Sequence, residues 1–580
     1  MNSSSRLVAS VMAVVVLGAG TLQGQGTLPD SVARRIDAVF ARYDSATSPG
    51  CALGVYRDGR IAYEKAYGSA NLELGVPLKP SSVFDIGSTS KQFTAMSILL
   101  LQQDGKLRLE DNVRKYIPEL RDYGTPITIG HLLHHTSGLR DYTTLLVLAG
   151  EPTENWTTDD DALGVLVRQH GLNFKPGTDW QYSNSGFFLL SIIVKRVSGE
   201  SLRRFAQHRI FEPLGMTHTH IHDDHTMLVP HRAIGYIPSD SGGPFRIEMS
   251  DWEQTGDGSV LTTIEDLIKW DQNFYTGAVG GPAVLAAMVK PGTLANGKVL
   301  DYASGLFIGE YRGLKTVEHG GAWAGYRAQL LRFPTEHVSF ACLCNLGSAD
   351  PDGMAQRVAD VYLADRLGPA PAKEQVASGS DTVASAGAPV LPPERLRTVV
   401  GTYRDPKLGG VARIVAPDGK PMLKYSGGSF ALEPVSASEF KLADLDVRLR
   451  LLPTDSGKPR RIQLIGSGLN RPTLEEVKPY VPAPAALREF EGEFVSDELD
   501  SSYRIALEKG ALVLHARNLP ATPLEPTIRN EFEYPTYGLT LHFIRHSGRV
   551  SGFTLASGRT QGIRFERGAA TSSPARPPAR

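Results

Sequence analysis

The sequence predicts an α+β protein of 580 residues, in which a mixed N-terminal region precedes an all-β C-terminal region. Three observations support this. Residues 28–365 alternate short apolar runs typical of strands with longer helical patterns. Residues 368–394 are rich in Pro, Ala, Ser and Gly, as linkers are. Strand patterns with hairpin turns dominate after that segment. At about 150 residues per domain, we expect three or four domains.

The first residues are predicted to be a secretory signal peptide, residues 1–26. Arg6 precedes an apolar run from Leu7 to Leu17, and small residues follow it. We expect cleavage between Gly20 and Gly26. A membrane anchor is the alternative, but the run is shorter than the ~20 residues that span a bilayer. Absence of a cysteine near this site disfavours a lipid anchor. The sequence therefore predicts export to a bacterial periplasm or beyond, with no stable membrane insertion after cleavage.

Composition excludes several classes of function. Lys plus Arg number 61 and Asp plus Glu 62, giving a net charge of −1. Nucleic-acid binders and polybasic membrane-surface proteins normally carry a basic excess. The three cysteines, Cys51, Cys342 and Cys344, are too few for a disulfide scaffold or a four-cysteine zinc site. Cys342 and Cys344 would share one face of a strand, which is poor geometry for a mutual disulfide, so we interpret them as small buried hydrophobes.

We predict the following order along the chain: signal peptide 1–26, a mixed α+β domain 27–366, linker 367–394, β domain 395–480, β domain 484–567 and a disordered tail 568–580. The two β domains look duplicated. Leu396, Gly401 and Tyr403 correspond to Leu487, Gly492 and Phe494 at a constant offset of 91 residues. A hairpin signal follows in each copy, Asp418-Gly419 in the first and Lys509-Gly510 in the second.

The strongest local motif is Ser88-x-x-Lys91, at the start of a predicted helix. The stretch from about Thr89 to Asp104 lacks Pro and Gly and is apolar nearly all round, which indicates a buried helix that Gly105 ends. Ser88 and Lys91 share one face near the helix N-terminus. A serine hydroxyl is a weak nucleophile that needs a base, and a neutral Lys91 is one. Taken alone, Ser88 is equally a helix N-cap and Lys91 a solvated charge.

Two further segments carry polar residues of the kinds that hydrolases use. Tyr182-Ser183-Asn184 precedes another apolar helix; Tyr182 is a proton relay or simply a packed aromatic, and Asn184 a donor to a substrate carbonyl. His319-Gly320-Gly321 follows a strand from Leu314 to Glu318 and is either a close backbone approach or a hairpin turn. A third glycine motif, Gly256-Asp257-Gly258, precedes an expected capping box of Thr262 and Glu265.

Taken in order, Ser88-x-x-Lys91, Tyr182-x-Asn184 and His319-x-Gly321 resemble the three motifs of the penicillin-recognising serine hydrolases. The surrounding stretches ITIGHLLHHTSGLRDY, YSNSGFFLLS, IFEPLGMTHTHI and TGDGSVLTTIEDLIKW sharpen the resemblance to the branch with class C β-lactamases, D-aminopeptidase, D-alanyl-D-alanine carboxypeptidase and related esterases. It covers about residues 30–365. The two C-terminal domains are similar to the small antiparallel, lipocalin-like barrels that follow the catalytic domain in D-aminopeptidase.

The resemblance implies a fold for the first domain. A five-stranded antiparallel sheet is expected between helices, beside a mostly helical lobe. The first strands, around 51–56 and 60–67, would pair with the last, around 338–345. This placement would bring Cys51 near Cys342 or Cys344, so one disulfide with either partner is implied.

The resemblance also implies roles for the motif residues. Ser88 would be the acylated nucleophile, Lys91 and Tyr182 would share the proton as base and then acid, and Asn184 would orient the substrate carbonyl. The backbone N–H groups of Ser88 and Ala322 would form the oxyanion hole, where losing one donor typically costs about 10²–10³ in rate. His319, Gly320 and Gly321 would line the substrate site. No metal or organic cofactor is implied.

One residue departs from the class C β-lactamase pattern, which has Lys where this chain has His319. A histidine of pKa ~6.5 is charged in only about a quarter of molecules at pH 7, so we expect weaker recognition of a substrate carboxylate. The D-aminopeptidase and esterase branches commonly have His here. D-aminopeptidase also sends a loop from a β domain to the active site, and the long, Pro-rich segment 520–537 is our candidate for it.

Two histidine groups fall outside these motifs. His218, His220, His222 and His225 lie within eight residues, beside two aspartates, and either bind a metal adventitiously or none at all. His134 and His135 precede the TSGL stretch, and we expect them to be structural.

The sequence predicts an exported serine hydrolase of small amides or esters, including D-amino-acid peptides, some of them peptidoglycan-derived. D-aminopeptidase or other peptidase, esterase, and β-lactamase or carboxypeptidase activities remain open. The alternative from another class is a non-catalytic protein that binds cell-wall fragments. Small-molecule or peptide substrates are the expected partners, nucleic acid is not, and the oligomeric state is left open.

Overall fold

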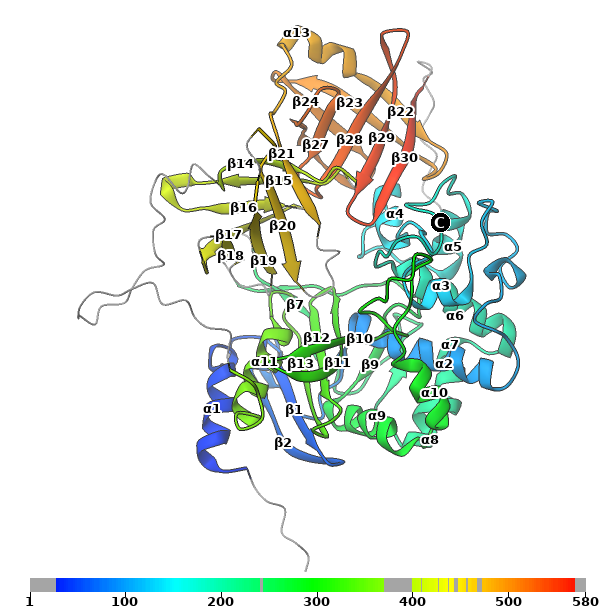
Figure 1. Ribbon diagram of the computed structural model, residues 1–580, viewed down its shortest axis with the longest axis vertical. Helices are drawn as coiled ribbons and strands as arrows, with labels where there is room; N and C mark the ends of the chain where they lie inside the picture. Colours follow the sequence, from blue (N-terminus) through cyan, green and yellow to red (C-terminus); the bar gives the residue numbers. More distant parts are fainter. Residues whose placement is uncertain are drawn as a thin grey trace, which may run out of the picture.

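The computed structural model describes residues 28–239, 244–369 and most of 399–568, leaving out 408, 426, 437, 443–446, 455–456 and 467–471 in the last range. The predicted signal peptide, all but the first residues of the predicted linker and all but the first residue of the predicted tail lie outside the described residues. The described part has a mixed sheet-and-helix domain, a helical lobe and two β domains (Figure 1). None of its helices combines the length and apolarity that crossing a bilayer requires.

A six-stranded antiparallel sheet, in the order β10-β11-β12-β13-β1-β2, is the centre of the first domain. Its strands are β1 (Cys51–Arg57), β2 (Arg60–Tyr67), β10 (Phe307–Tyr311), β11 (Leu314–Trp323), β12 (Tyr326–Phe333) and β13 (Val338–Cys344). The expected pairing of the first strand with the last is present, because β1 lies between β13 and β2. The expected count of five strands was wrong, since β10 adds a strand beside β11.

Helices cover both faces of this sheet. On one face α1 (Asp30–Phe40) and α11 (Pro351–Tyr362) bury Ile36, Phe40 and Val358 against the apolar side of β13. On the other, α9 (Ile264–Thr276) packs against β1 and β13, and Tyr56 Oη donates to the Ile264 carbonyl. Short elements complete the frame, namely η1 (Ala41–Tyr43), β3 (Ser69–Asn71), β4 (Val76–Pro77), β5 (Phe84–Asp85), β6 (His220–Ile221), β7 (Tyr236–Ile237), β8 (Arg246–Ile247) and β9 (Val260–Thr262).

The helical lobe surrounds one buried helix, α2 (Lys91–Gln103), which follows the 3₁₀ turn η2 (Gly87–Ser90). Residues 91–101 of α2 are all buried, as the unbroken apolar pattern predicted, and Gly105 follows with a φ of 70°. Around it lie η3 (Val113–Lys115), α3 (Ile129–Leu133), α4 (Tyr142–Ala149), α5 (Asp159–Val167), α6 (Asn184–Ser198), α7 (Leu202–Ala206), the π-helical turn η4 (Gln207–Phe211), α8 (Glu212–Leu214) and α10 (Gly281–Met288).

The predicted capping box at Thr262 and Glu265 was wrong by one residue. Helix α9 begins at Ile264, and its N-cap is Thr263, whose hydroxyl accepts from the backbone N–H of Asp266. Thr262 is instead the last residue of β9, where its hydroxyl contacts that of Thr219. Two adjacent threonines offered the same chemistry, and the strand pairing of β9 decided which one begins the helix.

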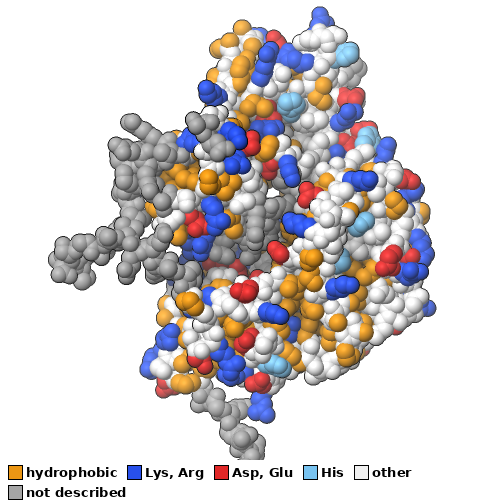
Figure 2. Space-filling view, viewed as in Figure 1, with side chains coloured by type: hydrophobic (Ala, Val, Ile, Leu, Met, Phe, Trp, Pro, Cys, Tyr) orange, Lys and Arg blue, Asp and Glu red, His pale blue; other side chains and the backbone are white. Residues whose placement is uncertain are grey.

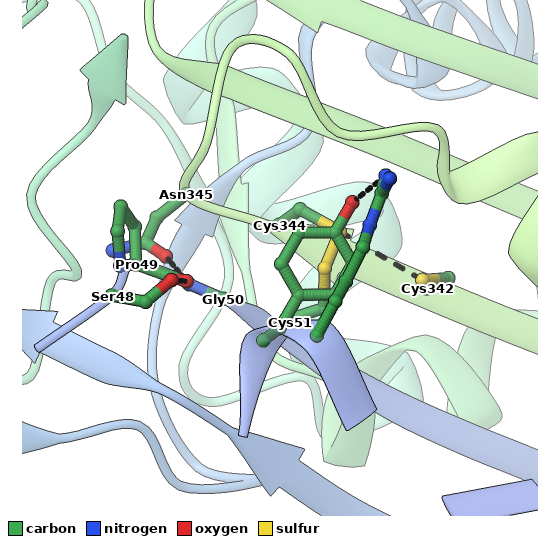
Figure 3. Close-up of a disulfide and its surroundings, with 9 residues drawn as sticks. Ser48, Pro49, Gly50, Cys51, Cys342, Cys344 and Asn345 are labelled. Atoms are coloured by element: carbon green, nitrogen blue, oxygen red, sulfur yellow. Dashed lines mark hydrogen bonds between the residues drawn. A yellow bond between two sulfur atoms is a disulfide. The ribbon is translucent and has the colours of Figure 1, made fainter. Parts of the chain in front are cut away.

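A disulfide joins Cys51 to Cys344 across the neighbouring strands β1 and β13 (Figure 3). The two residues are direct partners in the antiparallel register, so the implied disulfide has Cys344 as its partner. Cys342 remains a buried free thiol, in keeping with its interpretation as a small hydrophobe. Asn345, next to the disulfide, accepts from the Gly50 N–H and fixes the start of β1.

The first β domain is a closed barrel with its own apolar core. Its strands are β14 (Gly401–Arg404), β15 (Val411–Val415), β16 (Met422–Tyr425), β17 (Gly428–Pro434), β18 (Glu439–Leu442), β19 (Val447–Leu452), β20 (Arg461–Gly466) and β21 (Thr473–Val477). The predicted hairpin is present, with Asp418 and Gly419 at φ values of 52° and 75° between β15 and β16. Such left-handed turn residues suit the twist of a hairpin.

The second β domain is a nine-stranded antiparallel sheet around buried phenylalanines. After α13 (Pro484–Leu487) and η6 (Arg488–Phe490) come β22 (Gly492–Ser496), β23 (Ser501–Glu508), β24 (Ala511–Ala516), β25 (Leu519–Pro523), β26 (Glu525–Pro526), β27 (Glu531–Tyr534), β28 (Leu539–His546), β29 (Arg549–Ser557) and β30 (Thr560–Arg567). The predicted hairpin at Lys509-Gly510 joins β23 to β24. Tyr403 and Phe494, the repeat's matched aromatics, are both fully buried on the first strands of their domains.

Candidate active site

A cleft of about 490 Å³ lies between the start of α2, the start of α6 and strand β11. Its lining includes every predicted site residue except Lys91, namely Ser88, Tyr182, Asn184, His319, Gly320, Gly321 and Ala322. Three segments that are far apart in the sequence therefore converge on one cavity. Basic and acidic side chains are interspersed on the face shown in Figure 2, in keeping with the near-zero net charge.

Ser88 and Lys91 are in direct contact within this site. The Lys91 side chain is fully buried, and its Nζ lies 3.0 Å from Ser88 Oγ, 3.0 Å from Asn184 Oδ1 and 2.6 Å from the Asp257 carbonyl oxygen. Ser88 sits in the turn η2 before the helix, and Ser90 is the residue that precedes α2. The interpretations of Ser88 as an ordinary N-cap and of Lys91 as a solvated charge therefore do not describe this pair.

The three contacts of Lys91 use the hydrogen-bonding capacity of its side-chain nitrogen. Two of its partners are carbonyl oxygens, which accept only, so they take two N–H groups. The third partner is the Ser88 hydroxyl oxygen, to which Nζ donates. Nζ therefore lies within the hydrogen-bond reach of Ser88 Oγ that a general base needs.

Two glycines let β11 approach the turn that holds Ser88. A Cβ atom on Gly321 would lie 1.9 Å from the Ile86 carbonyl oxygen, and one on Gly87 would lie 2.7 Å from the Ala322 nitrogen. Gly87 also has a φ of 48°. His319-Gly320-Gly321 lies inside β11, so the close backbone approach is present and the alternative of a hairpin turn was wrong. The contact sets the Ala322 backbone next to the turn that holds Ser88.

Tyr182 has an unpartnered hydroxyl on the cleft wall. No described residue makes a hydrogen bond to its Oη, although the side chain is only 6% exposed. Its ring packs against His135 with centroids 4.3 Å apart, and Lys91 Nζ lies 4.9 Å from its centroid. Packing thus holds the ring in place, while no described residue uses the hydrogen-bonding capacity of the buried hydroxyl.

Asn184 is the first residue of α6, and its backbone N–H donates to the buried carboxylate of Asp141. Its side-chain oxygen accepts from Lys91, which fixes the direction of the amide group. No described residue accepts from its side-chain nitrogen, so this donor is available to a substrate carbonyl on the cleft side.

His319 is buried, and both of its ring nitrogens have protein partners. Nδ1 lies 2.6 Å from the Gly320 carbonyl oxygen, which can only accept, so Nδ1 carries the proton. Nε2 then accepts from Tyr302 Oη at 3.0 Å. Burial, reinforced by the charge of Lys91, lowers the pKa of His319 to about 3. In this arrangement His319 is neutral and has no N–H left for a substrate carboxylate.

Asp257 is a site residue that the sequence analysis noticed only as part of a glycine motif. It lines the cleft with 8% of its surface exposed, and its carboxylate accepts from Tyr142 Oη at 3.0 and 3.2 Å. Burial raises its pKa to about 7, with the charge of Lys91 and the Tyr142 hydrogen bond opposing that shift. An acidic side chain flanked by two glycines was the signal that could have found it.

Arg559, from the turn between β29 and β30, also lines the cleft. Its guanidinium carbon lies 4.9 Å from the Tyr182 ring centroid. The expectation that segment 520–537 reaches the site was wrong, because the cleft lining contains none of its residues. That segment instead contacts the first barrel. Its Glu525 pairs with Arg413 of the barrel, and its Thr536 carbonyl packs against Gly427 of the barrel. Nothing local in the sequence distinguishes Arg559 from other surface arginines.

The two histidine groups take separate positions. His135 is buried in the site wall, where its Nδ1 accepts from the Ser183 N–H, and burial lowers its pKa well below the usual range. His134 lies beneath Gly292, and burial lowers its pKa to about 4. The cluster around residue 220 is not a single site. His225 pairs with Glu253, His220 contacts His222, and His218 faces solvent.

Comparisons with known proteins agree with this geometry. A model of the Beta-lactamase family matches residues 35–363. A D-aminopeptidase of Gluconobacter oxydans (strain 621H) is 29% identical over 425 residues, which cover 73% of this chain and 75% of that protein. An alignment of that length extends beyond residue 363. Penicillin-binding protein 4* of Bacillus subtilis (strain 168) is 32% identical over 308 residues, which cover 50% of this chain and 66% of that protein.

The fold is similar to that of a solved structure as well. The octameric penicillin-binding protein homologue from Pyrococcus abyssi aligns with a TM-score of 0.54 and 24% identity. The alignment covers 77% of this chain and 99% of that chain.

Proposed function

The chain belongs to the beta-lactamase family and is a serine hydrolase of that family, and we propose that it cleaves short D-amino-acid amides or peptides through an acyl-enzyme on Ser88. The observation that carries this proposal is the contact between Ser88 Oγ and the buried Lys91 Nζ on the cleft wall. The name of the similar Gluconobacter protein, a D-aminopeptidase, supports the choice of substrate class.

Acylation begins with attack of Ser88 Oγ on the substrate carbonyl carbon. The hydroxyl proton passes to Lys91 Nζ, which lies 3.0 Å from Oγ and is held there by its contacts with Asn184 and the Asp257 carbonyl. The backbone N–H groups of Ser88 and Ala322 hold the developing oxyanion, and the free side-chain nitrogen of Asn184 holds a substrate carbonyl.

Collapse of the tetrahedral intermediate breaks the amide C–N bond and forms the acyl-enzyme ester. The leaving nitrogen needs a proton, and the Tyr182 hydroxyl is free to deliver one from Lys91. Water then attacks the ester by the same route in reverse, releasing the acid and restoring Ser88. Lys91 and Tyr182 act as a coupled pair in both halves of the reaction.

An aminopeptidase also has to bind the substrate's α-ammonium group close to the reacting carbonyl. Asp257 fits this role, because it lines the cleft and its backbone carbonyl oxygen accepts a hydrogen bond from Lys91, the proposed base. The only side-chain hydrogen bond to this carboxylate among the described residues comes from the neutral Tyr142 hydroxyl, so a substrate ammonium would supply the countercharge that the protein does not. Asp257 therefore favours amine-bearing substrates over simple esters.

We also propose that the enzyme works outside the cytoplasm. The support is the predicted signal peptide, residues 1–26. Periplasmic and cell-wall D-amino-acid peptides are then the natural substrates. N-terminal sequencing of the protein exported by a bacterial host tests this, with a new N-terminus between Gly20 and Gly26 as the expected result.

The first experiment compares wild-type protein with Ser88→Ala. The substrates are D- and L-alanine p-nitroanilide, p-nitrophenyl acetate and butyrate, and nitrocefin. We expect cleavage of D-alanine p-nitroanilide to be preferred and to fall at least about 10⁴-fold in Ser88→Ala. Intact-mass analysis of quenched wild-type protein should show the acyl group on Ser88. Ester cleavage without anilide cleavage would assign an esterase, and nitrocefin cleavage alone a β-lactamase.

The role of Asp257 is tested with Asp257→Asn, which keeps the backbone contact to Lys91. The KM for D-alanine p-nitroanilide should rise about tenfold or more, whereas p-nitrophenyl acetate, which has no amine, should be cleaved at the wild-type rate. The wild-type preference for the amine substrate should rise with pH through about 7, as the carboxylate forms. It should fall above about 8, where an α-amine loses its proton. Equal losses on both substrates would contradict this role.

A further inference from the structure

One of the charged residues that line the cleft, Arg559, comes from outside the catalytic domain. Arg559 lies on the turn between β29 and β30, about 470 residues after Ser88 in the chain. Its side chain is exposed on the cleft side. No ion pair joins it to a carboxylate among the described residues. An unpaired guanidinium in a substrate cleft is free to bind an anion.

The turn that carries Arg559 is fixed to the catalytic domain by its backbone. The Arg559 carbonyl accepts from Asn173 Nδ2 at 2.9 Å and from the Asp141 N–H at 3.3 Å. Gln181 Nε2 donates to the Gly558 carbonyl, and the Gln561 N–H donates to Asn173 Oδ1. Asp141 and Gln181 lie beside Asn184 and Tyr182 in structure or sequence, so the guanidinium is positioned relative to the reacting groups.

The position where a cation would be expected from the class C β-lactamase pattern does not provide one here. His319 is neutral, and its two nitrogens are occupied by Gly320 and Tyr302. Arg559 is the cationic group that lies near Tyr182 on the open side of the cleft. Tyr182 is our proposed proton donor to the leaving group, so Arg559 faces the part of the substrate that departs.

We propose that Arg559 is a specificity-determining residue that binds a carboxylate on the leaving-group side of the substrate. This rests on the proposed function and narrows it. With Asp257 taking the α-ammonium and Arg559 the carboxylate, the cleft fits short zwitterionic peptides with a free C-terminus. A guanidinium binds a carboxylate through two parallel hydrogen bonds, which neither His319 nor a lysine can reproduce.

The test uses one D-alanyl dipeptide in two forms, with a free C-terminal carboxylate and with a C-terminal amide. Wild-type protein should cleave the acid form about tenfold better, mainly through a lower KM, which is the effect of one partly exposed charge-assisted contact. Arg559→Gln should remove this preference, and Arg559→Lys should restore part of it. Arg564→Gln is the matched control, because Arg564 is an exposed arginine of the adjacent strand β30 outside the cleft lining.

Two outcomes would overturn the proposal. One is a wild-type protein that does not distinguish the acid from the amide. The other is an Arg559→Gln variant that loses activity equally on both, which would mean that the charge acts on Tyr182 rather than on the substrate. Calorimetric binding of both dipeptides to Ser88→Ala, with and without Arg559→Gln, gives the same answer without turnover. Failure of this inference is therefore distinguishable from failure of the Ser88 mechanism.

Discussion

The two C-terminal β domains begin with matching strands but relate differently to the catalytic domain. The first is a closed barrel whose apolar core is separate from all others. The core of the second is continuous with the core of the helical lobe. Among the described residues of the two β domains, only Arg559, in the second domain, lines the catalytic cleft. Two domains that begin with similar local sequence therefore differ in their distance from the cleft, because only the second contributes a residue to its lining.

The contacts at each boundary explain this difference. The second domain places the buried carboxylate of Glu498 against Arg140 of the lobe, and Tyr503 Oη donates to the Leu148 carbonyl. Toward the catalytic domain, the first barrel makes the exposed pair of Lys407 and Asp179 at 3.8 Å. The first barrel instead contacts the second domain, through the ion pair of Arg404 with Glu531. Buried contacts with the lobe therefore distinguish the β domain that reaches the cleft from the one that does not.

The largest expected effect comes from the matched core aromatics. Phe494→Ala and Tyr403→Ala each remove a fully buried ring, which costs about 4 kcal/mol of unfolding free energy. Because the second domain shares the lobe's core, Phe494→Ala should also lower Ser88-dependent activity. Tyr403→Ala should lower only the calorimetric transition of the first barrel. Equal effects of the two variants on activity would break the comparison.

The next effect comes from one acidic residue in each domain. Glu498 and Arg140 are 1% and 5% exposed, whereas Glu476 and Arg460 of the first barrel are 31% and 33% exposed. Removing one partner of a buried pair leaves an uncompensated charge, so Glu498→Ala should destabilise by about 3 kcal/mol. Glu476→Ala should cost about 0.5 kcal/mol. Urea unfolding followed by tryptophan fluorescence and by activity measures both; an activity loss in Glu476→Ala would contradict the assignment.

A smaller effect, the loss of stability at acid pH, should also distinguish the two β domains. Burial acts to raise the pKa of Glu498, but the N–H groups of Arg564 and His170 and the charge of Arg140 outweigh it, so its pKa is lowered. A carboxyl with a lowered folded pKa stabilises above its unfolded value of about 4.3, and this contribution is lost as the pH falls below that value.

The lobe contact of the second domain should therefore loosen below about pH 4, seen as faster limited proteolysis between 480 and 500. Glu498→Gln should abolish this pH dependence. High salt should suppress the pH-dependent stabilisation that the exposed Glu476 contributes. It should leave the contribution of the buried Glu498 nearly unchanged. A salt response of the same size at both positions would count against the distinction.

Two local substitutions test one turn in each domain. Asn173→Ala removes the hydrogen bond to the Arg559 carbonyl and should reduce the preference for the carboxylate dipeptide about threefold, with little change in Tm. Gly419→Ala strains a turn at a φ of 75° and should cost about 1 kcal/mol in the first barrel. Its kcat/KM on either dipeptide should equal that of the wild type.

Much of the site could be predicted because its motifs are local. Ser88 and Lys91 are three residues apart at the start of one helix, so the helix itself brings them together. The apolar pattern of residues 91–101 and the two hairpins are likewise set by neighbouring residues. The number of strands in the sheet was not predicted, because β10 has only five residues and joins through pairing with β11.

By itself, then, the sequence determined the α+β class, the all-β character of the C-terminal region and the three motifs that meet in the cleft. Only the tertiary structure decided that Cys344 rather than Cys342 pairs with Cys51, that both ring nitrogens of His319 have protein partners, and that Asp257 and Arg559 line the cleft. The physical reason is distance along the chain. Periodicity and spacing report interactions within a few residues, whereas these outcomes depend on burial and register between segments that meet only on folding.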